Sequence, residues 1–231
     1  MKSSRNASGP RPGAASRATL LAAATRLFAQ YGYEGASVER IASRAKVNRA
    51  MVSYHFGGKQ KLYRAILRRG LEALEQRLAV VRSCANPAPR RLAQFVEAFA
   101  AVATEQVSFP AIMLREVLSG GHHLDGILLS HMAAAFGLVR EIIEQGVRER
   151  SFRAVDPVLT HLGLIGSLVF YFASAPTRSR LISEGKLAVR SEPPIGDYVR
   201  HIQELMTLGL TAPALNPSPR RNHGLKVSRR R

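Results

Sequence analysis

Residues 37–59 constrain the fold more than any other part of this chain. Their first half places apolar side chains at the i, i+3, i+4, i+7 spacing of a single buried helical face: Val38, Ile41, Ala42 and Ala45. Ser37, directly before this pattern, is a typical helix N-cap, and Glu39 falls in the first turn, where the helix dipole favours an acidic side chain. The pattern therefore predicts a short helix that buries one face.

A second short helix is expected after a break at residues 46–47. Asn48 can supply the oxygen of its N-cap, and we expect the helix to run over residues 49–55 until Gly57 and Gly58 end it. Its apolar side chains are available to pack inward: Met51, Val52 and Phe56. Two short helices joined by a tight turn are typical of a helix-turn-helix, whose second helix reads the major groove of DNA.

Residues 27–63 resemble the DNA-binding domain of TetR-type transcriptional regulators. Many landmarks match at fixed spacing: Leu27, Phe28, Gly32, Ser37, Val38, Ile41, Ala42, Ala45, Val47, Tyr54, His55, Phe56, Lys59 and Leu62. The resemblance implies an all-α fold of about nine helices, with an N-terminal three-helix helix-turn-helix domain and a C-terminal helical domain that binds a ligand and forms dimers. One departure is Lys46, which stands where the family usually has glycine; a left-handed backbone there would cost about 1 kcal/mol.

The net charge of +18 is concentrated at the two ends of the chain. Residues 1–60 carry ten Lys and Arg against two acidic residues, and residues 212–231 carry six against none, whereas residues 61–211 carry 18 against 14. Such clustering predicts a polyanionic partner, although the C-terminal charges can equally serve solubility.

The apolar run 162–175 is shorter than the ~20 residues of a membrane span, so we expect a soluble, cytoplasmic protein without a membrane partner.

The periodicity of apolar residues divides the chain into four parts. We expect a disordered basic arm that either touches DNA or is a solvated extension, a helix-turn-helix domain, a helical effector-binding and dimerisation domain, and a disordered basic tail: residues 1–15, 16–62, 63–211 and 212–231. Beyond the helix-turn-helix, helices are expected over residues 59–82, 90–107, 109–118, 122–150, 157–174 and 195–210. Residues 177–194 are expected to form a mobile connection.

Base recognition is expected from four residues at and after the start of the second helix: Asn48, Arg49, Ala50 and Ser53. Arg49 can offer two donors to guanine, and Ala50 allows close approach and contact with a thymine methyl. Asn48 has two possible roles, because it caps the helix and its amide can also face adenine. The alternative for Arg49 is an ordinary surface charge.

Contacts to DNA phosphates are expected from a second set, which the family resemblance places along the backbone: Ser37, Tyr54, His55 and Lys59. Lys46 adds a further cation near the DNA. A hydroxyl, a phenol, an imidazole and ammonium groups can all bind phosphate oxygens. Either Tyr54 or His55 can instead be partly buried by helix packing.

The C-terminal part carries no recognisable catalytic motif, so we expect no enzyme activity and no cofactor. His123 and His131 lie eight residues apart on an expected helix, too far for good chelation, and we expect no metal. The expected effector pocket involves four side chains: Phe99, Arg115, His131 and Phe136. Arg115 and Glu116 are interpreted as an ion pair capping that pocket or as exposed charges.

Residues 157–174 are apolar on nearly every side, so a second copy of the chain is expected to cover their outer face. The resemblance implies that this segment and residues 195–210 form the dimer interface. Two functions fit the sequence: a homodimeric repressor that a small-molecule effector releases from a palindromic DNA operator, or a non-specific DNA-coating protein without an effector.

Overall fold

The computed structural model describes residues 12–189 and 191–211, which are helical apart from turns, loops and one isolated β-bridge between Phe152 and Thr211. The helices of this part of the chain are α1 (Pro12–Gly35), α2 (Val38–Ala45), α3 (Ala50–Phe56), α4 (Lys59–Ser83), α5 (Ala88–Glu105), α6 (Phe109–Leu118), α7 (Gly126–Arg148), α8 (Pro157–Ala173), α9 (Ala175–Ser183) and α10 (Ile195–Leu210). The predicted all-α class is confirmed. The basic tail and most of the expected arm lie outside the described residues.

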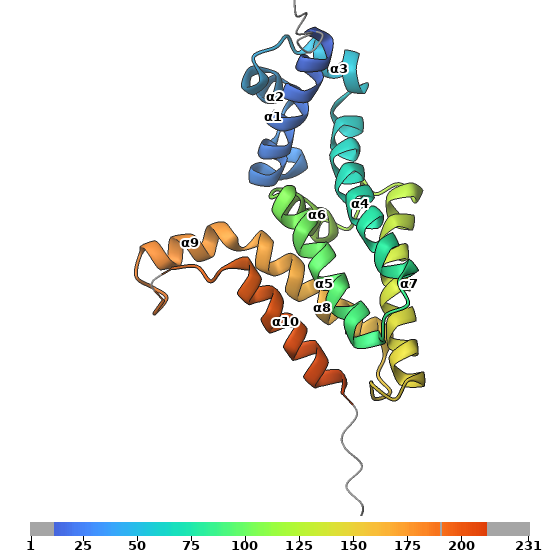
Figure 1. The fold of residues 1–231 in the computed structure, drawn as a ribbon. Helices are drawn as coiled ribbons and strands as arrows, with labels where there is room; N and C mark the ends of the chain where they lie inside the picture. Colours follow the sequence, from blue (N-terminus) through green and yellow to red (C-terminus); the bar gives the residue numbers. More distant parts are fainter. Residues whose placement is uncertain (1–11, 190, 212–231) are drawn as a thin grey trace, which may run out of the picture.

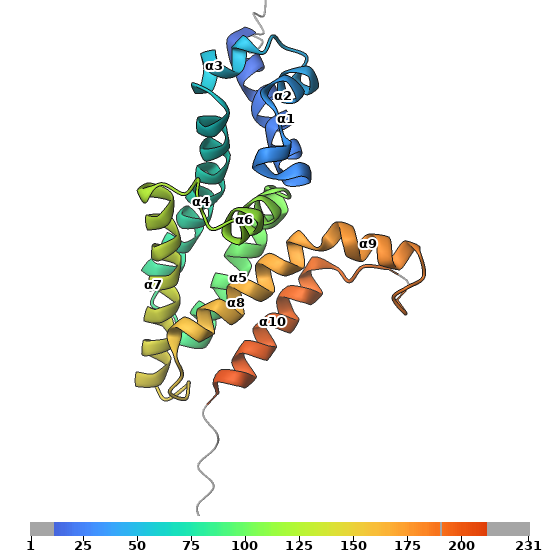
Figure 2. The ribbon, with the colours of Figure 1, turned by 180° about the vertical axis from the view of Figure 1, so that it is seen from behind.

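The helices form two stacked groups that α4 joins (Figure 1). Helices α1, α2 and α3 gather at one end near the beginning of α4, whereas α5, α6 and α7 pack on α4 further along, and α8 and α10 pack in turn on those helices. The view from behind shows the same division, with α9 projecting away from the bundle (Figure 2). The described residues therefore form a small three-helix unit on a larger helical domain.

Side-chain caps fix several helix starts at the places where the sequence has Asp. Asp156 accepts hydrogen bonds from the N–H groups of Val158 and Leu159 at the start of α8, as expected from Asp followed by Pro. Asp125 accepts one from Leu128 N–H at 3.0 Å, so α7 begins at Gly126 and not at residue 122. The earlier start was wrong because Gly120 and Gly121 hold the preceding turn at positive φ.

Helix α9 and the start of α1 also differ from the sequence prediction, and α5 lies two residues earlier than the predicted range 90–107. Residues 175–183, mostly assigned to a mobile connection, form α9, which ends at Ser183, shortly before Gly185 with φ 66°. Its side chains are not buried, so the helix carries no strong apolar periodicity that the sequence could reveal. Helix α1 begins at Pro12, four residues before the expected start of the helix-turn-helix domain at residue 16, because Pro is well tolerated in a first helical turn. Gly32 interrupts α1 with φ 72° and ψ −178°, a positive φ that favours glycine.

A continuous apolar core runs through both groups of helices, and α4 belongs to both. Leu62, Tyr63 and Leu67 of α4 are buried in the first group, and Leu74 and Leu78 are buried in the second. Helix α7 is long and apolar enough to cross a membrane by composition alone. It packs instead on α4, α5 and α8, with its buried residues forming an inward stripe: Leu128, Ala135, Leu138, Val139, Ile142, Ile143 and Gly146.

The closest approach of α4 to α6 depends on Gly70. A Cβ atom at this position would overlap the ring of Phe109, the first residue of α6. We therefore expect Gly70→Ala to lower the free energy of unfolding by about 1–3 kcal/mol through overpacking, measured by urea denaturation.

Gly137→Ala is the matched control, because Gly137 lies inside α7 with no atom near its Cβ position. This control should raise stability by about 0.5–1 kcal/mol through helix propensity. A Gly70→Ala protein as stable as the Gly137→Ala protein would show that the approach of α4 to α6 is not tight.

Candidate nucleic-acid interface

The three N-terminal helices pack so that one side of α2 and α3 is buried and the other faces outward. Ile41, Ala42 and Ala45 of α2 and Val52 and Phe56 of α3 are buried. All of these except Ala42 join a cluster with side chains of α1 and α4 that are also almost fully buried: Leu20, Ala24, Leu27, Phe28 and Leu62. This packing leaves the polar positions of both short helices available to solvent.

The start of α2 is capped as the sequence predicted. The Ser37 hydroxyl oxygen accepts a hydrogen bond from Arg40 N–H at 3.2 Å, and Ser37 itself is exposed. Arg40 also places its guanidinium 3.9 Å from the ring centroid of Tyr31. The first turn of α2 is thereby tied to α1 while its outer surface remains open.

The turn between α2 and α3 is left-handed at Lys46, with φ 55° and ψ 43°. Lys46 N–H donates to Ser43 C=O at 3.1 Å, and Val47 N–H donates to Ala42 C=O at 3.0 Å. These two bonds are the Schellman arrangement that normally favours glycine in the left-handed position. The departure from the family pattern therefore carries backbone strain, and it places an exposed cation on the outer surface.

Asn48 fixes the start of α3. Its side-chain oxygen accepts a hydrogen bond from Ala50 N–H at 2.9 Å, which confirms the capping role expected from the sequence. This bond uses the oxygen and leaves the amide donors without a described protein partner. Asn48 is exposed, so capping and an outward-facing amide are compatible.

Arg49 lies at the outer start of α3 and forms an ion pair with Glu39 of α2. The Arg49 Nη1 to Glu39 Oε1 distance is 3.2 Å, and the two side chains are 72% and 63% exposed. An ion pair that exposed contributes at most about 1 kcal/mol, so exchanging Glu39 for a DNA group costs little. The ion pair thus keeps the Arg49 guanidinium near α2 but is weak enough for Arg49 to change partners.

The remaining α3 candidates divide into exposed and packed side chains. Ala50, Ser53 and Tyr54 are exposed, and Tyr54 reaches 78%. His55 is half-buried, its ring contacts those of Tyr54 and Phe56, and its Nε2 is buried without a described hydrogen-bond partner. The sequence left open whether Tyr54 or His55 is partly buried by helix packing, and in the structure it is His55.

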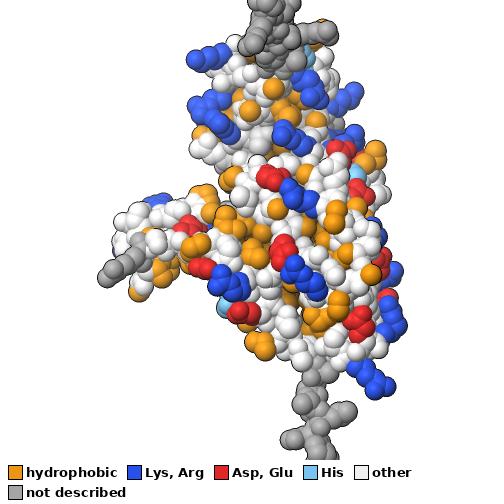
Figure 3. Space-filling model, in the orientation of Figure 1, with side chains coloured by type: hydrophobic (Ala, Val, Ile, Leu, Met, Phe, Trp, Pro, Cys, Tyr) orange, Lys and Arg blue, Asp and Glu red, His pale blue; other side chains and the backbone are white. Residues whose placement is uncertain are grey.

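Lys59 begins α4 at the edge of this surface, with its Nζ 4.2 Å from the ring centroid of Tyr33. Lys and Arg side chains predominate over the end of the molecule formed by α1 to α3, whereas acidic side chains mix with them over the helices beyond (Figure 3). The surface that carries the candidate contacts is therefore the electropositive end of the molecule.

The four candidates for an effector pocket lie at separate places. Phe99 is buried beside Phe172, and Phe136 of α7 contacts the ring of His161 on α8. His131 of α7 hydrogen-bonds Glu75 of α4 and borders a cavity of only about 10 Å³. The Arg115 side chain points away from the C-terminal domain and contacts α1. The four side chains therefore do not line one common pocket in the structure.

Arg115 and Glu116 do not form the ion pair that one interpretation of the sequence required. Arg115 donates from Nε to Ala29 C=O at 3.1 Å and from Nη2 to Gln30 C=O at 3.3 Å. The carbonyls belong to α1, so the guanidinium links α6 to the DNA-binding unit. Glu116 is 1% exposed, and thus neither of its expected roles, pocket cap or exposed charge, was correct.

Sequence reasoning missed the cluster around Glu116, which joins the two groups of helices. Its carboxylate accepts a hydrogen bond from His123 N–H at 2.7 Å and lies 3.0 Å from His123 Nδ1. The His123 ring rests on Tyr33 with centroids 3.8 Å apart, and Arg64 Nε donates to His123 C=O at 2.9 Å. Burial and the Glu116 carboxylate raise the pKa of Tyr63 above its ordinary value.

A periodic signal for this cluster was present in the sequence. Glu116 falls in phase with the buried positions Phe109, Ile112 and Met113 of α6, seven residues after the first of them. An acidic residue in phase with an apolar stripe predicts a buried carboxylate that needs a partner. The partner itself, His123, lies in a loop, and no periodicity identifies it.

A capped two-helix unit with an exposed polar surface, mounted on a larger helical domain, defines a helix-turn-helix DNA-binding protein. Residues 20–66 match the family model described as bacterial regulatory proteins, tetR family, and residues 89–191 match the tetracyclin repressor-like C-terminal domain. The chain belongs to the TetR family of transcriptional regulators, whose members are not enzymes.

One curated relative supports the same assignment, and two solved structures share the fold. The HTH-type transcriptional repressor NicS of Pseudomonas putida is 31% identical over 200 residues, which cover 84% of this chain and 92% of NicS. The regulator PfmR of Thermus thermophilus matches with a TM-score of 0.66 and 23% identity, covering 84% of this chain and 99% of PfmR. AibR, in complex with isovaleryl coenzyme A and operator DNA, matches with a TM-score of 0.64 and 20% identity, covering 86% of this chain and all of AibR.

The strain at Lys46 generates a prediction about stability. Lys46→Gly should raise the free energy of unfolding by about 1 kcal/mol, because glycine adopts the left-handed conformation without a Cβ clash. Lys46→Ala is the control, since it removes the same charge but keeps the Cβ atom, and it should leave stability nearly unchanged. Urea denaturation of the three proteins measures the difference; equal stability of the Gly and Ala variants would mean that the turn is unstrained.

Proposed function

We propose that this protein is a homodimeric transcriptional repressor of the cytoplasm that binds a two-fold symmetric DNA operator and leaves it when a small-molecule effector binds. The observation that carries the proposal is the outward-facing start of α3, where Arg49, Ala50 and Ser53 are exposed beside the Asn48 cap. A helix start with donors and small side chains is what base recognition in the major groove requires.

In this proposal the base-reading residues are Asn48, Arg49, Ala50 and Ser53. Arg49 exchanges its exposed Glu39 partner for guanine, and the free amide donors of Asn48 face the neighbouring base edge. The exposed methyl group of Ala50 lies at a position that suits a thymine methyl.

The phosphate contacts in this proposal come from the rim of the same surface: Ser37, Lys46, Tyr54, His55 and Lys59. Exposure of Ser37, Lys46 and Tyr54 supports the assignment most directly. His55 contributes less, because its ring is partly enclosed by its neighbours. These contacts fix the position of the protein and carry no sequence information themselves.

The dimer interface that we propose consists of α8 and α10. One face of α8 presents an apolar stripe at helical spacing, Leu159, Leu162, Gly163, Gly166 and Phe170, of which the three large side chains are 68%, 59% and 66% exposed. Leu205 and Leu208 of α10 are 50% and 76% exposed. Apolar stripes of this length in a soluble protein indicate a protein partner, and a second copy is self-complementary by two-fold symmetry.

Two copies related by a two-fold axis present α3 twice, which is why the operator is proposed to be palindromic. The link from effector to DNA is proposed to run through α4, because this helix is buried in both groups of helices. An effector that prefers one arrangement of α4 and DNA that prefers another weaken each other's binding reciprocally.

The alternative function is non-specific coating of DNA through the basic ends of the chain. Most of those charges fall outside the described residues. The Asn48 cap of α3 and the exposed side chains of Arg49, Ala50 and Ser53, by contrast, favour sequence-specific recognition of DNA. A competition experiment at moderate salt separates the two, because a specific regulator prefers its operator over random DNA by about 10³-fold or more.

The proposed base contact of Arg49 and the proposed phosphate contact of Lys59 can be distinguished by two substitutions. Arg49→Ala should cost about 1–3 kcal/mol of binding free energy at one base position and relax the preference there. Lys59→Ala should weaken binding to all sequences alike and reduce the dependence on salt concentration by about one phosphate contact. Binding to the selected operator and to random DNA, measured over a range of salt, decides between them; equal losses on both DNAs in both variants would contradict base reading by Arg49.

The proposed dimer interface generates a further prediction. Leu162→Glu should convert the dimer into monomers, because a carboxylate at the centre of a buried apolar face is costly to desolvate. Val80→Glu is the matched control, since Val80 is 67% exposed on α4, away from α8 and α10. Analytical ultracentrifugation should detect monomers for Leu162→Glu alone. An unchanged mass for that variant would exclude this face as the interface.

A further inference from the structure

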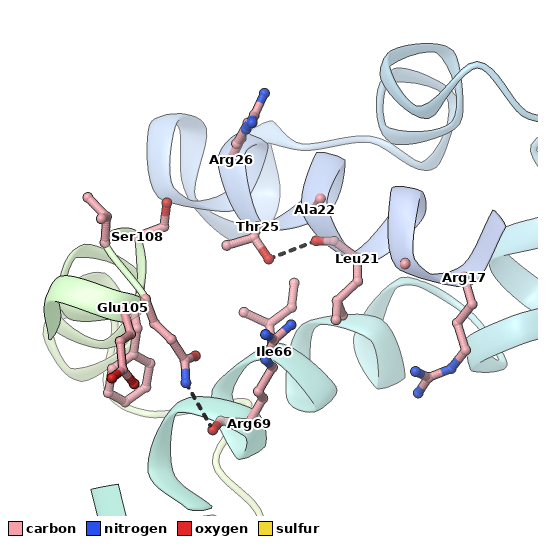
Figure 4. A pocket seen from close by; sticks show the side chains of 13 residues that line it. Arg17, Leu21, Ala22, Thr25, Arg26, Ile66, Arg69, Glu105 and Ser108 are labelled. Atoms are coloured by element: carbon pink, nitrogen blue, oxygen red, sulfur yellow. Dashed lines mark hydrogen bonds between the residues drawn. The ribbon is translucent and has the colours of Figure 1, made fainter. Parts of the chain in front are cut away.

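Two adjoining hollows lie between α1 and α4, the first bordered also by the turn that connects α5 with α6 and the second by Asp125 before α7. Their volumes are about 580 Å³ and 560 Å³, and they share Arg17, Leu21 and Arg69. Figure 4 shows the first of them, with α1 along one side and Ile66 and Arg69 of α4 along the other. Each volume lies within the range of small-molecule sites in proteins, about 300–1,000 Å³.

The lining of this double hollow has two chemically different halves. The part next to the α5–α6 turn is mainly apolar and includes Leu21, Ala22, Ile66, Val107 and Phe109. The part that follows α4 toward its beginning is cationic and includes Arg17, Lys61, Arg64, Arg68 and Arg69. Its acidic residues are Glu72 and Asp125, so the cationic half has a clear excess of positive charge.

The cations of this half are only partly matched by partners within the described residues. Asp125 approaches Arg68 at 3.6 Å, and Arg64 donates to a backbone carbonyl. The side chains of Lys61 and Arg69 form no ion pair in this part of the chain. Arg68 Nε is buried and has no hydrogen-bond partner there. A buried donor without an acceptor is costly, so an oxyanion in the hollow would satisfy a need that the protein leaves open.

We propose that the double hollow binds an amphipathic organic phosphate, with its phosphate among Arg68, Arg69 and Lys61 and its apolar part between Leu21, Ile66 and Phe109. Multiple arginines favour a phosphate over a singly charged carboxylate, because guanidinium groups can donate several hydrogen bonds to its oxygens. The apolar half removes a short hydrocarbon group from water.

This inference rests on the proposed ligand response and gives the effector a chemical class and a place. Helix α1 packs beneath α2 and α3, and α4 runs on into the C-terminal domain. A molecule held between α1 and α4 acts directly on the spacing of these helices. The ligand and the operator then favour different spacings and oppose each other's binding.

Hexyl phosphate is the probe for a calorimetric titration of the full-length protein without DNA. The wild-type protein should bind it at one site per chain. Arg69→Ala should weaken binding by about tenfold or more, since a charge-assisted hydrogen bond is lost. Val107→Asp should weaken it similarly by placing a charge in the apolar half, and because Val107 is 74% exposed this variant should fold normally.

The control variant is Arg148→Ala, which removes the same charge from an exposed position at the end of α7. It should bind hexyl phosphate within about twofold of the wild-type protein. Hexanol and hexanoate should each bind at least about tenfold more weakly than hexyl phosphate, as should inorganic phosphate. Absence of binding, equal binding by all four proteins, or equal binding of hexanol or hexanoate would overturn the proposal.

Operator binding is measured separately, first without the probe and then with it. Loss of operator affinity when hexyl phosphate is added to the wild-type protein, but not when it is added to Arg69→Ala, supports the coupling. Specific hexyl phosphate binding by a protein that prefers no DNA sequence would contradict the proposed function and leave the ligand site supported. Specific DNA binding without any hexyl phosphate binding would contradict only the ligand site.

Discussion

The arrangement of this protein depends on α4, because the same helix is packed into the cores of both groups of helices. Its 25 residues extend about 37 Å at the rise of an α-helix, so a rotation or shift at one end is carried to the other. At its beginning Leu62 and Tyr63 are buried where α4 packs on α1 and α3, and at its later turns Leu74 and Leu78 are buried against the C-terminal domain. Neither group of helices can be moved relative to the other without repacking α4, and this constraint makes communication between them possible.

The buried carboxylate of Glu116 gives that junction a defined geometry. An unpaired charge at this depth would be strongly destabilising, whereas here it is held by the backbone N–H and the ring of His123. His123 in turn rests on Tyr33, which lies under Lys59 at the edge of the DNA-binding surface. Arg115 adds a second connection from α6 to the carbonyls near the end of α1. A displacement of α6 would therefore break several polar contacts at once, so the junction favours discrete arrangements over gradual ones.

Local signals were sufficient for much of the fold, and long-range contacts account for the rest. Ser37, Asn48 and Asp156 cap the helices that follow them, because a cap needs only the residue and the next few N–H groups. The same reasoning placed α8 and α10 within a residue of their observed bounds. It failed for α9, which lacks a buried face, and for His123 and Arg115, whose contacts with Tyr33 and Gln30 join residues about 90 and 85 positions apart in the sequence. The outer residues of α3 were identified from the sequence, but the ion pair of Arg49 with Glu39 depends on how two helices meet.

The glycines of α8 have a physical explanation in the dimer that we propose but not in the folding of the single chain. Gly163 and Gly166 are exposed on one face of the helix, and an added Cβ atom at either would meet nothing within 4 Å. Each glycine costs the helix about 0.5–1 kcal/mol relative to alanine, and nothing in the single chain requires its small size. The three-residue spacing places both on the stripe that also carries Leu162 and Phe170. In the dimer that we propose, a second copy would approach closely along this stripe and give the two glycines the packing role that the single chain does not provide, because a surface without side chains allows two helix backbones to come near each other.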